Sequence, residues 1–339
     1  MLRITSPIFC ALLFAAPLAP VTAAATAPLT ADQLALVVND DDPSSVAVAE
    51  LYRQAHDVPE RNIVHVNIPG SPRRLTAAQF QAVKARIDTQ LPAAVEAVLM
   101  VWTAPYAVEC NGITAAFTLG FDALQCIKPC GPGTASPYFD RPADQPRNPA
   151  GGRLSMLLPT QSVAVAKAVI ARGATRNFQL PNATAYFLVT GDKARSTRAQ
   201  NFPPSGRLAQ KNLNVRTLFA DSLDDKHDVM IYQTGLVKVN NLESLTFLPG
   251  ALADHLTSTG GDLLSNAQMS ILRWLEAGAT ASYGTVAEPC NYWQKFPSGK
   301  VLLRHYVSGE TAIESYWKSV AWPSQGLIIG DPLAAPYRR

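Results

Sequence analysis

The sequence predicts an α/β protein built on a mostly parallel β-sheet with helices on both faces. Short apolar runs alternate along the chain with longer segments of helical periodicity, and most of the apolar runs show no regular polar alternation. Such strands are typical of a parallel sheet covered on both faces, because burial on both sides leaves no position for polar residues. The charge content agrees with this, since 16% of the 339 residues are charged, against about 25% in an average soluble domain.

The predicted elements of the N-terminal half lie between residues 30 and 102. Leu34–Val38 is an apolar run of strand length, and the segment over 44–56 after it has apolar residues at helical spacing. Asp42 or Ser44 is the expected N-cap of this helix, because either side chain can accept a hydrogen bond from a free backbone N–H. The same patterns predict strands over 62–69 and 94–102 and a helix over 76–91.

The alternation stops over residues 103–153 and then resumes. This stretch is rich in glycine and proline and holds three cysteines, which predicts a long loop or insertion. The stretch over 250–256 is ambiguous. The remaining predicted elements are strands over 154–158, 184–189, 214–219, 229–233, 280–286 and 325–329, and helices over 161–172, 265–279 and 301–320, the last with a break at Ser308–Gly309 left open.

The mature chain is expected to form one large domain over 26–339. Its halves, 30–102 and 154–337, are joined by the loop-rich stretch 103–153, and no Pro/Gly/Ser linker separates two complete units. The net charge of +3 excludes a nucleic-acid binder that works through a strong basic field.

The first 25 residues have the features of a secretory signal peptide. Arg3 supplies the positive charge, an apolar run over 8–16 follows, and small residues over 21–25 suit a cleavage site. The alternative is a membrane anchor, but the run is too short to span comfortably. The protein is therefore expected to be exported, to the periplasm or the extracellular space, with no transmembrane segment in the mature chain.

Four cysteines remain after removal of this segment, and an even number in an exported protein predicts disulfides. Cys126 and Cys130 lie close together in a Gly/Pro-rich loop, so the expected pairs are Cys126–Cys130 and Cys110–Cys290, with the other pairings still open. The alternative role for Cys290 is a catalytic thiol. A zinc site is not predicted, because no histidine or second cysteine pair accompanies this spacing.

The densest group of polar residues follows the ambiguous stretch. Asp254 and His255 are an acid–base pair, Ser258 is one of three hydroxyl residues that come next, and Gly260 and Gly261 follow. A histidine beside a carboxylate can act as a general base, and amides of a glycine-rich turn can stabilise an oxyanion. The same residues also suit a helix cap and a tight turn.

A second polar group, over 284–290, follows the next predicted strand. A strand–helix–strand unit places both strand ends on one edge of a sheet, so His255 and Cys290 are expected to approach each other. Cys290 is then half of a cysteine–histidine dyad or half of a disulfide. Glu288 is a carboxylate partner for His255 or a solvated loop acid.

Three further polar groups follow predicted strands, at 39–42, 190–195 and 330–331. The acidic run in 39–42 suits a hard cation, but such a run is more often a solvated loop with a helix N-cap. We predict no metal and no cofactor, and the ligand class is left at an unknown small molecule or peptide.

At these motifs the chain resembles a family of exported bacterial proteins of unknown function. The resemblance rests on Asn39–Pro43 with Ser45, Ala49 and Tyr52, on Val58–Pro59 with Asn62, and on the runs 254–258, 278–286 and 329–333. These motifs cover nearly the whole mature chain, and the family implies no established activity.

A fainter likeness is to cysteine peptidases of the gingipain and caspase type, which implies a caspase-like fold. Those enzymes carry His-Gly at one strand end and Cys at the next, whereas here Leu256 follows His255 and Cys290 sits beyond its strand. The likeness therefore implies either a peptidase or a related scaffold whose catalytic residues have been lost.

Two functions follow as hypotheses. The first is a hydrolase-like enzyme in which His255 is the general base, Asp254 or Glu288 orients it, and Ser258 or water is the nucleophile. The second is a non-catalytic envelope or binding protein on a degenerate peptidase-like scaffold. Burial of His255 against core residues favours the second hypothesis.

Overall fold

A computed structural model describes residues 2, 27–149, 151–175 and 182–338. The predicted signal peptide, apart from Leu2, lies outside the described residues. None of the helices in the described ranges is long and apolar enough to cross a membrane.

Eleven strands of the described chain form one sheet in the order β2-β1-β4-β7-β14-β13-β12-β11-β8-β10-β9. Adjacent strands run parallel except at β13/β14 and β9/β10, which confirms the predicted α/β class. The strands are β1 (Leu34–Asn39), β2 (Ile63–Val66), β4 (Ala97–Val101), β7 (Leu154–Leu158), β8 (Ala183–Val189), β9 (Gly206–Leu208), β10 (Leu213–Phe219), β11 (Val229–Thr234), β12 (Phe247–His255), β13 (Ala281–Thr285) and β14 (Gly326–Gly330).

The sheet consists of two parallel halves that run in opposite directions. Strands β1, β2, β4, β7 and β14 lie in the spatial order 2-1-3-4-5 when counted along the chain, and β8, β10, β11, β12 and β13 repeat that order. The two fifth strands, β13 and β14, meet as the antiparallel pair at the centre. The C-terminal strand β14 thus completes the N-terminal half of the sheet.

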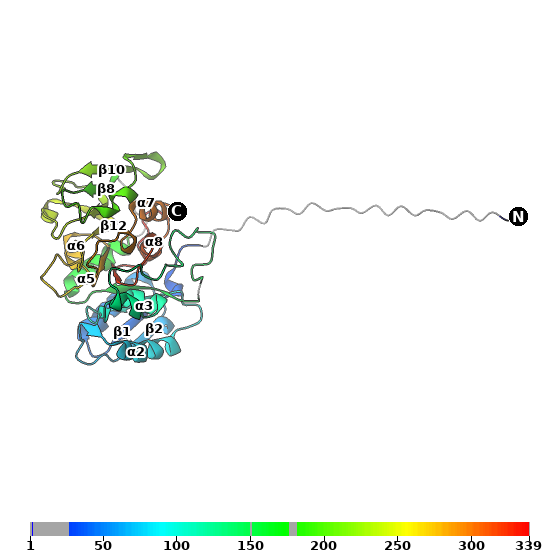
Figure 1. Cartoon of the computed structure of the whole chain (residues 1–339). Coiled ribbons are helices and arrows are strands. Elements are labelled where there is room, and N and C mark those ends of the chain that lie inside the picture. Colours follow the sequence, from blue (N-terminus) through cyan, green and yellow to red (C-terminus); the bar gives the residue numbers. More distant parts are fainter. Residues whose placement is uncertain (1, 3–26, 150, 176–181, 339) are drawn as a thin grey trace.

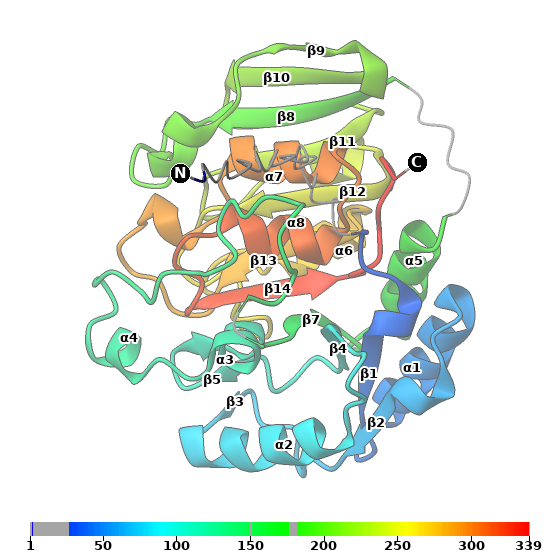
Figure 2. The same cartoon turned by 90° about the vertical axis from the view of Figure 1, so that its right-hand side faces the viewer.

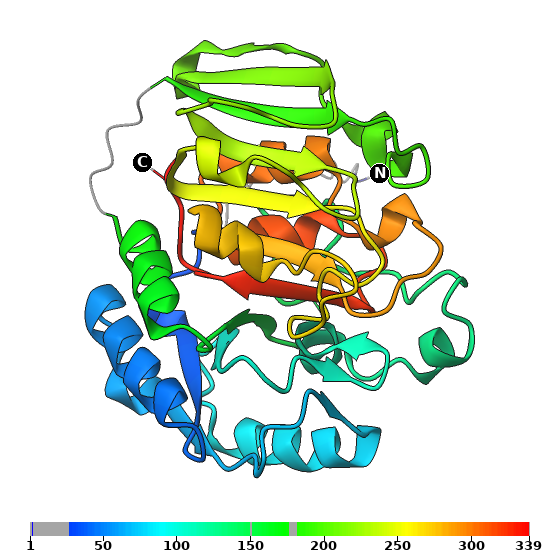
Figure 3. The same cartoon turned by 90° about the vertical axis from the view of Figure 1, so that its left-hand side faces the viewer.

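Helices cover both faces of this sheet. Figure 3 shows the face covered by α1 (Pro43–His56), α5 (Val163–Gly173) and α6 (Leu272–Ala277). Figure 2 shows the other face, covered by α3 (Ile113–Leu119), α7 (Gly299–Val307) and α8 (Ala312–Ser319). Helix α2 (Ala77–Gln90) packs against the edge strand β2. At the start of α1, Asp42 is the N-cap, and its side chain accepts a hydrogen bond from the Ser44 backbone N–H.

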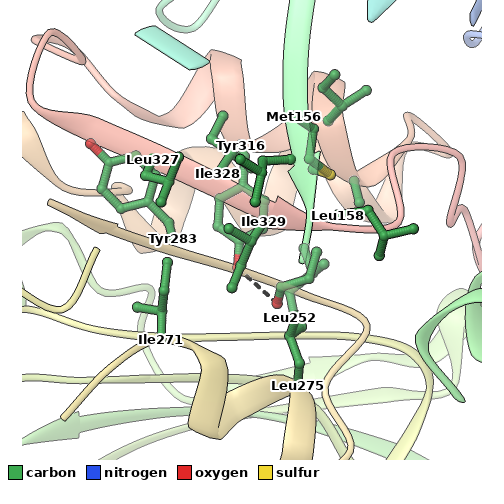
Figure 4. Close-up of a cluster of buried hydrophobic side chains, with 14 of the residues drawn as sticks. Met156, Leu158, Leu252, Ile271, Leu275, Tyr283, Tyr316, Leu327, Ile328 and Ile329 are labelled. Atoms are coloured by element: carbon green, nitrogen blue, oxygen red, sulfur yellow. Dashed lines mark hydrogen bonds between the residues drawn. The ribbon is translucent and has the colours of Figure 1, made fainter. Parts of the chain in front are cut away.

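The core lies between these layers, where strand and helix side chains interdigitate. Figure 4 shows part of it, in which Tyr316 of α8 lies near Tyr283 of β13 and the apolar residues of β14. The five residues of β14 are all buried. Burial of a strand on both faces explains why its sequence has no polar alternation.

The structure resolves two elements that the sequence left open and corrects one predicted helix. The ambiguous stretch over 250–256 belongs to strand β12. The helix predicted over 265–279 is only α6, because the Met269 and Ile271 amides bond to the Val237 and Gly260 carbonyls rather than within a helix. The segment over 301–320 is two helices, since Gly309 has a φ of +102° and a capping box at Thr311 starts α8.

The stretch 103–153 is more ordered than predicted. It contains α3 and α4 (Ala123–Ile127), and β5 (Ala107–Val108) and β6 (Asn111–Gly112) form a small sheet with β3 (Arg74–Leu75). This second sheet has three strands among the described residues.

The disulfide pairing predicted from the sequence is wrong. The bridges are Cys110–Cys126 and Cys130–Cys290, with Cα–Cα distances of 5.4 and 5.5 Å. Asn111 exchanges hydrogen bonds with the Asp122 backbone ahead of α4, which holds Cys126 beside Cys110. The predicted Cys126–Cys130 pair was based on closeness along the chain, which does not show how α4 is oriented. The two disulfides indicate an oxidising, exported environment.

Candidate functional site

Asp254 and His255 are consecutive residues at the end of β12, so their side chains point to opposite faces of the sheet. Asp254 faces α8, and His255 faces α6. This alternation separates the acid–base pair that looked adjacent in the sequence, and no hydrogen bond joins the two side chains within the described part of the chain.

His255 is fully buried and uses both ring nitrogens. Its Nδ1 accepts a hydrogen bond from the Trp274 indole at 2.9 Å, and its Nε2 lies 3.1 Å from the Met269 carbonyl, to which it donates. Burial, with a smaller contribution from the Arg198 charge, lowers the pKa of His255 to about 3. The imidazole is therefore neutral, with its proton on Nε2, and neither nitrogen is free to take a proton from Ser258.

We expect the variant His255→Gln to change the pH dependence of stability. Below pH ~6.5 the unfolded chain binds a proton at His255, whereas the folded chain does not. As the pH falls, this residue therefore lowers the free energy of unfolding by up to about 1.4 kcal/mol per pH unit. Glutamine offers an acceptor and a donor but does not titrate. Urea denaturation at several pH values between 7 and 4 gives the free energy of unfolding at each pH. This free energy should depend less steeply on pH in the variant than in the wild type, and an equal dependence on pH would contradict a neutral, buried His255.

Asp254 belongs to a buried ion pair on the opposite face. Arg198 forms an ion pair with its carboxylate and also donates to the Thr234 carbonyl at 2.7 Å, and Gln233 donates to Asp254 at 3.0 Å. Burial raises the pKa of Asp254, although the Arg198 charge opposes the rise. These contacts tie the segment after β8 to the ends of β11 and β12.

The turn that holds the remaining residues of the predicted hydrolytic site is fixed through its backbone. The Ser258 carbonyl accepts from the Glu288 backbone N–H at 2.8 Å, and the Gly261 amide donates to the Thr285 carbonyl at 2.8 Å. Gly260 lies against the imidazole, where an added Cβ would stand 3.4 Å from a ring carbon of His255. The turn 257–261 is therefore pinned to the end of β13.

Glu288 is fully buried, and among the described residues no hydrogen bond or ion pair joins its side chain to His255. Its carboxylate accepts backbone hydrogen bonds from Cys290 at 3.2 Å and Asn291 at 2.6 Å, and Lys295 lies 3.6 Å away. Burial raises the pKa of Glu288, against the opposing charge of Lys295. The same burial lowers the pKa of Lys295. Cys290 next to this pair is bonded to Cys130, which leaves no thiol for a cysteine–histidine dyad.

In the polar groups at 39–42 and 330–331, Asn39 and Asp331 are buried and hydrogen-bonded, whereas Asp40 and Asp41 are exposed. The Asn39 side chain accepts from the Ile68 backbone N–H at 3.0 Å. Asp331 is fully buried, receives a hydrogen bond from Tyr52 at 3.0 Å and lies 2.7 Å from His56. In the described ranges, no group of three or more histidine, cysteine or acidic side chains is arranged to hold a metal ion.

A groove of about 1300 Å³ lies beside the turn over 257–261. It runs between the loop after β11 and the loop that precedes α6, which places it beyond the carboxyl ends of β10, β11 and β12, as expected for a ligand site in a parallel sheet. Arg73, between β2 and β3, and Gln161, which follows β7, complete its wall. A smaller recess of about 160 Å³ between α5 and α6 shares Gln161, Leu272 and Glu276 with the groove.

Gln268 connects this groove to the turn over 257–261. Its side-chain oxygen accepts from the Thr257 hydroxyl and the Thr259 backbone N–H, both at 2.8 Å. Sequence reasoning missed Gln268 because it assigned it to a helix. The signal that could have revealed the groove is the pair Asn240–Asn241, which follows β11 and lines the opposite wall.

The strand ends thus define an α/β protein with an open groove beside a buried, internally paired polar cluster. Comparisons with family models, with curated proteins and with solved structures found no match.

Proposed function

We propose that this chain is an exported, non-catalytic binding protein whose ligand site is the groove beyond β10–β12. The observation that carries the proposal is the state of His255, which is fully buried with both ring nitrogens hydrogen-bonded. A general base needs a nitrogen within reach of a substrate proton. The degenerate peptidase-like scaffold and a location in the periplasm are parts of this proposal.

The groove supports binding on independent grounds. It is concave and lined by a mixture of apolar side chains, hydroxyls and carboxamides, and such lining is usual in binding sites. Its described lining includes three cationic and three acidic side chains, so it carries no strong field of one sign.

The variant Asn240→Trp tests the site, because Asn240 is exposed and lines the groove. We expect it to lower the retention of ligands at least ten-fold, since an indole fills space that the ligand needs. The measurement is native mass spectrometry of the mature disulfide-bonded protein after incubation with a periplasmic extract. Gln81→Trp, which replaces an exposed amide on α2 away from the groove, is the matched control.

Turnover assays decide between binding and hydrolysis. We expect no cleavage of fluorogenic peptides or esters beyond the level of the Ser258→Ala variant. Cleavage by the wild-type chain that this variant abolishes, while its melting temperature is retained, would overturn the proposal in favour of a hydrolase.

A further inference from the structure

The recess between α5 and α6 has a different character from the groove into which it opens. Its walls are Val165, Ala166 and Val169 from α5 and Leu272 and Leu275 from α6. The two helices pack side by side on one face of the sheet (Figure 1). The lining also includes Pro159, Gln161, Ser162 and Glu276, so apolar side chains make up most of it.

The two volumes indicate the shape of the occupant. Pockets for drug-sized ligands span about 300–1000 Å³. The groove, at about 1300 Å³, exceeds this range, and the recess, at about 160 Å³, falls below it. An elongated ligand that lies along the groove and sends one apolar branch into the recess fits both values.

The polar side chains of the groove indicate the chemistry of the elongated part. Carboxamides stand on its walls, including Gln161, Asn240 and Asn266. Each carboxamide offers both a donor and an acceptor, the same pair of groups that a peptide backbone presents. The described lining of groove and recess contains no aromatic ring, so it has no stacking surface of the kind that binds nucleobases.

We infer that the groove binds an extended peptide and that the recess takes one large apolar side chain of it. This inference rests on the proposed binding function and adds the ligand class and the residue that anchors it. Balanced charge in the groove selects a peptide without a long run of acidic or basic residues. The apolar side chain gains affinity because the recess removes it from water.

The test uses two pools of blocked nine-residue peptides, one with leucine at the fifth position and one with alanine, the other positions being random. Each pool is incubated with the mature disulfide-bonded protein, and retained peptides are counted by mass spectrometry. We expect about ten-fold or more enrichment of the leucine pool, from the burial of one large apolar side chain.

The variant Val165→Trp fills the recess from a partly exposed position. It should remove the preference for leucine. The matched control is Ala164→Trp, the adjacent exposed position outside the recess, which should keep the preference. Melting temperatures of both variants report whether they fold, and if Val165→Trp does not fold, Val165→Phe makes the same measurement with a smaller side chain.

The outcomes separate this inference from the proposed function. Retention of both pools alike, or an undiminished leucine preference in the folded Val165 variant, overturns the anchoring role of the recess. Retention of neither pool by a protein that still captures a small molecule in a groove sensitive to Asn240→Trp overturns the peptide class alone. Capture of nothing from the pools and the extract overturns both.

Discussion

Replacing Arg198 by methionine is expected to lower the free energy of unfolding by roughly 3–5 kcal/mol. Arg198 and Asp254 are each 1% exposed and form a buried ion pair. Methionine keeps much of the apolar volume but leaves the Asp254 carboxylate without a cation in a site that water does not reach. Urea denaturation at pH 7 measures the loss.

The pH dependence of this loss provides an internal check. Burial already raises the pKa of Asp254, and removal of the guanidinium should raise it further. Over the pH range between its unfolded and folded pKa values, the folded variant then holds a proton that the unfolded chain lacks, so its stability falls as pH rises. The variant should therefore lose less stability in acid than at pH 7.

Two further variants serve as controls for this interpretation. Arg195→Met breaks a partly exposed ion pair with Asp192, and exposed pairs contribute about 0–1 kcal/mol. The double variant Arg198→Met/Asp254→Leu should recover most of the loss, because no buried charge remains. If Arg198→Met lowers the free energy of unfolding no more than Arg195→Met does, the buried ion pair does not stabilise the fold as proposed.

The second large effect is expected from the disulfides. Bridge Cys130–Cys290 spans 160 residues, and bridge Cys110–Cys126 spans 16. In the chain-entropy account, a loop of more than 100 residues contributes about 5 kcal/mol and one near 15 residues about 3 kcal/mol. The variant Cys130→Ala/Cys290→Ala should therefore unfold at a clearly lower urea concentration than Cys110→Ala/Cys126→Ala.

Peptide mapping without reduction checks the pairing that underlies this prediction. It should yield linked peptides for Cys110 with Cys126 and for Cys130 with Cys290, and no free thiol among these four. A linked Cys126–Cys130 peptide would contradict the structure, and equal losses from the two double variants would contradict the loop-length account.

Local patterns were sufficient for most of the fold. Apolar runs of strand length located strands such as β1 and β7 to within a residue or so, and Asp42, one of the two expected N-caps, starts α1. The predictions that were wrong lie where long-range contacts override local preference. The loop before α6 is an example, because its amides bond to Val237 and Gly260 instead of forming a helix.

The candidate site shows the same division. The sequence correctly indicated that polar residues gather after β12 and β13, yet it could not tell which of them face one another. Asp254 and His255 are neighbours along the chain, but the strand geometry turns them to opposite faces, towards Arg198 and Trp274 respectively. Arg198, which pairs with Asp254, and Trp274, which hydrogen-bonds to His255, both come from other segments of the chain.

The amino-acid pattern alone therefore decided the α/β class, the parallel strands and the concentration of polar residues at strand ends, because these depend on periodicity and local chain preference. Three features came only from the tertiary structure: the duplicated strand order joined at β13/β14, the cysteine pairing and the groove lined by Gln268. Each depends on the positions and directions of side chains brought together from distant parts of the chain, and no local pattern encodes them.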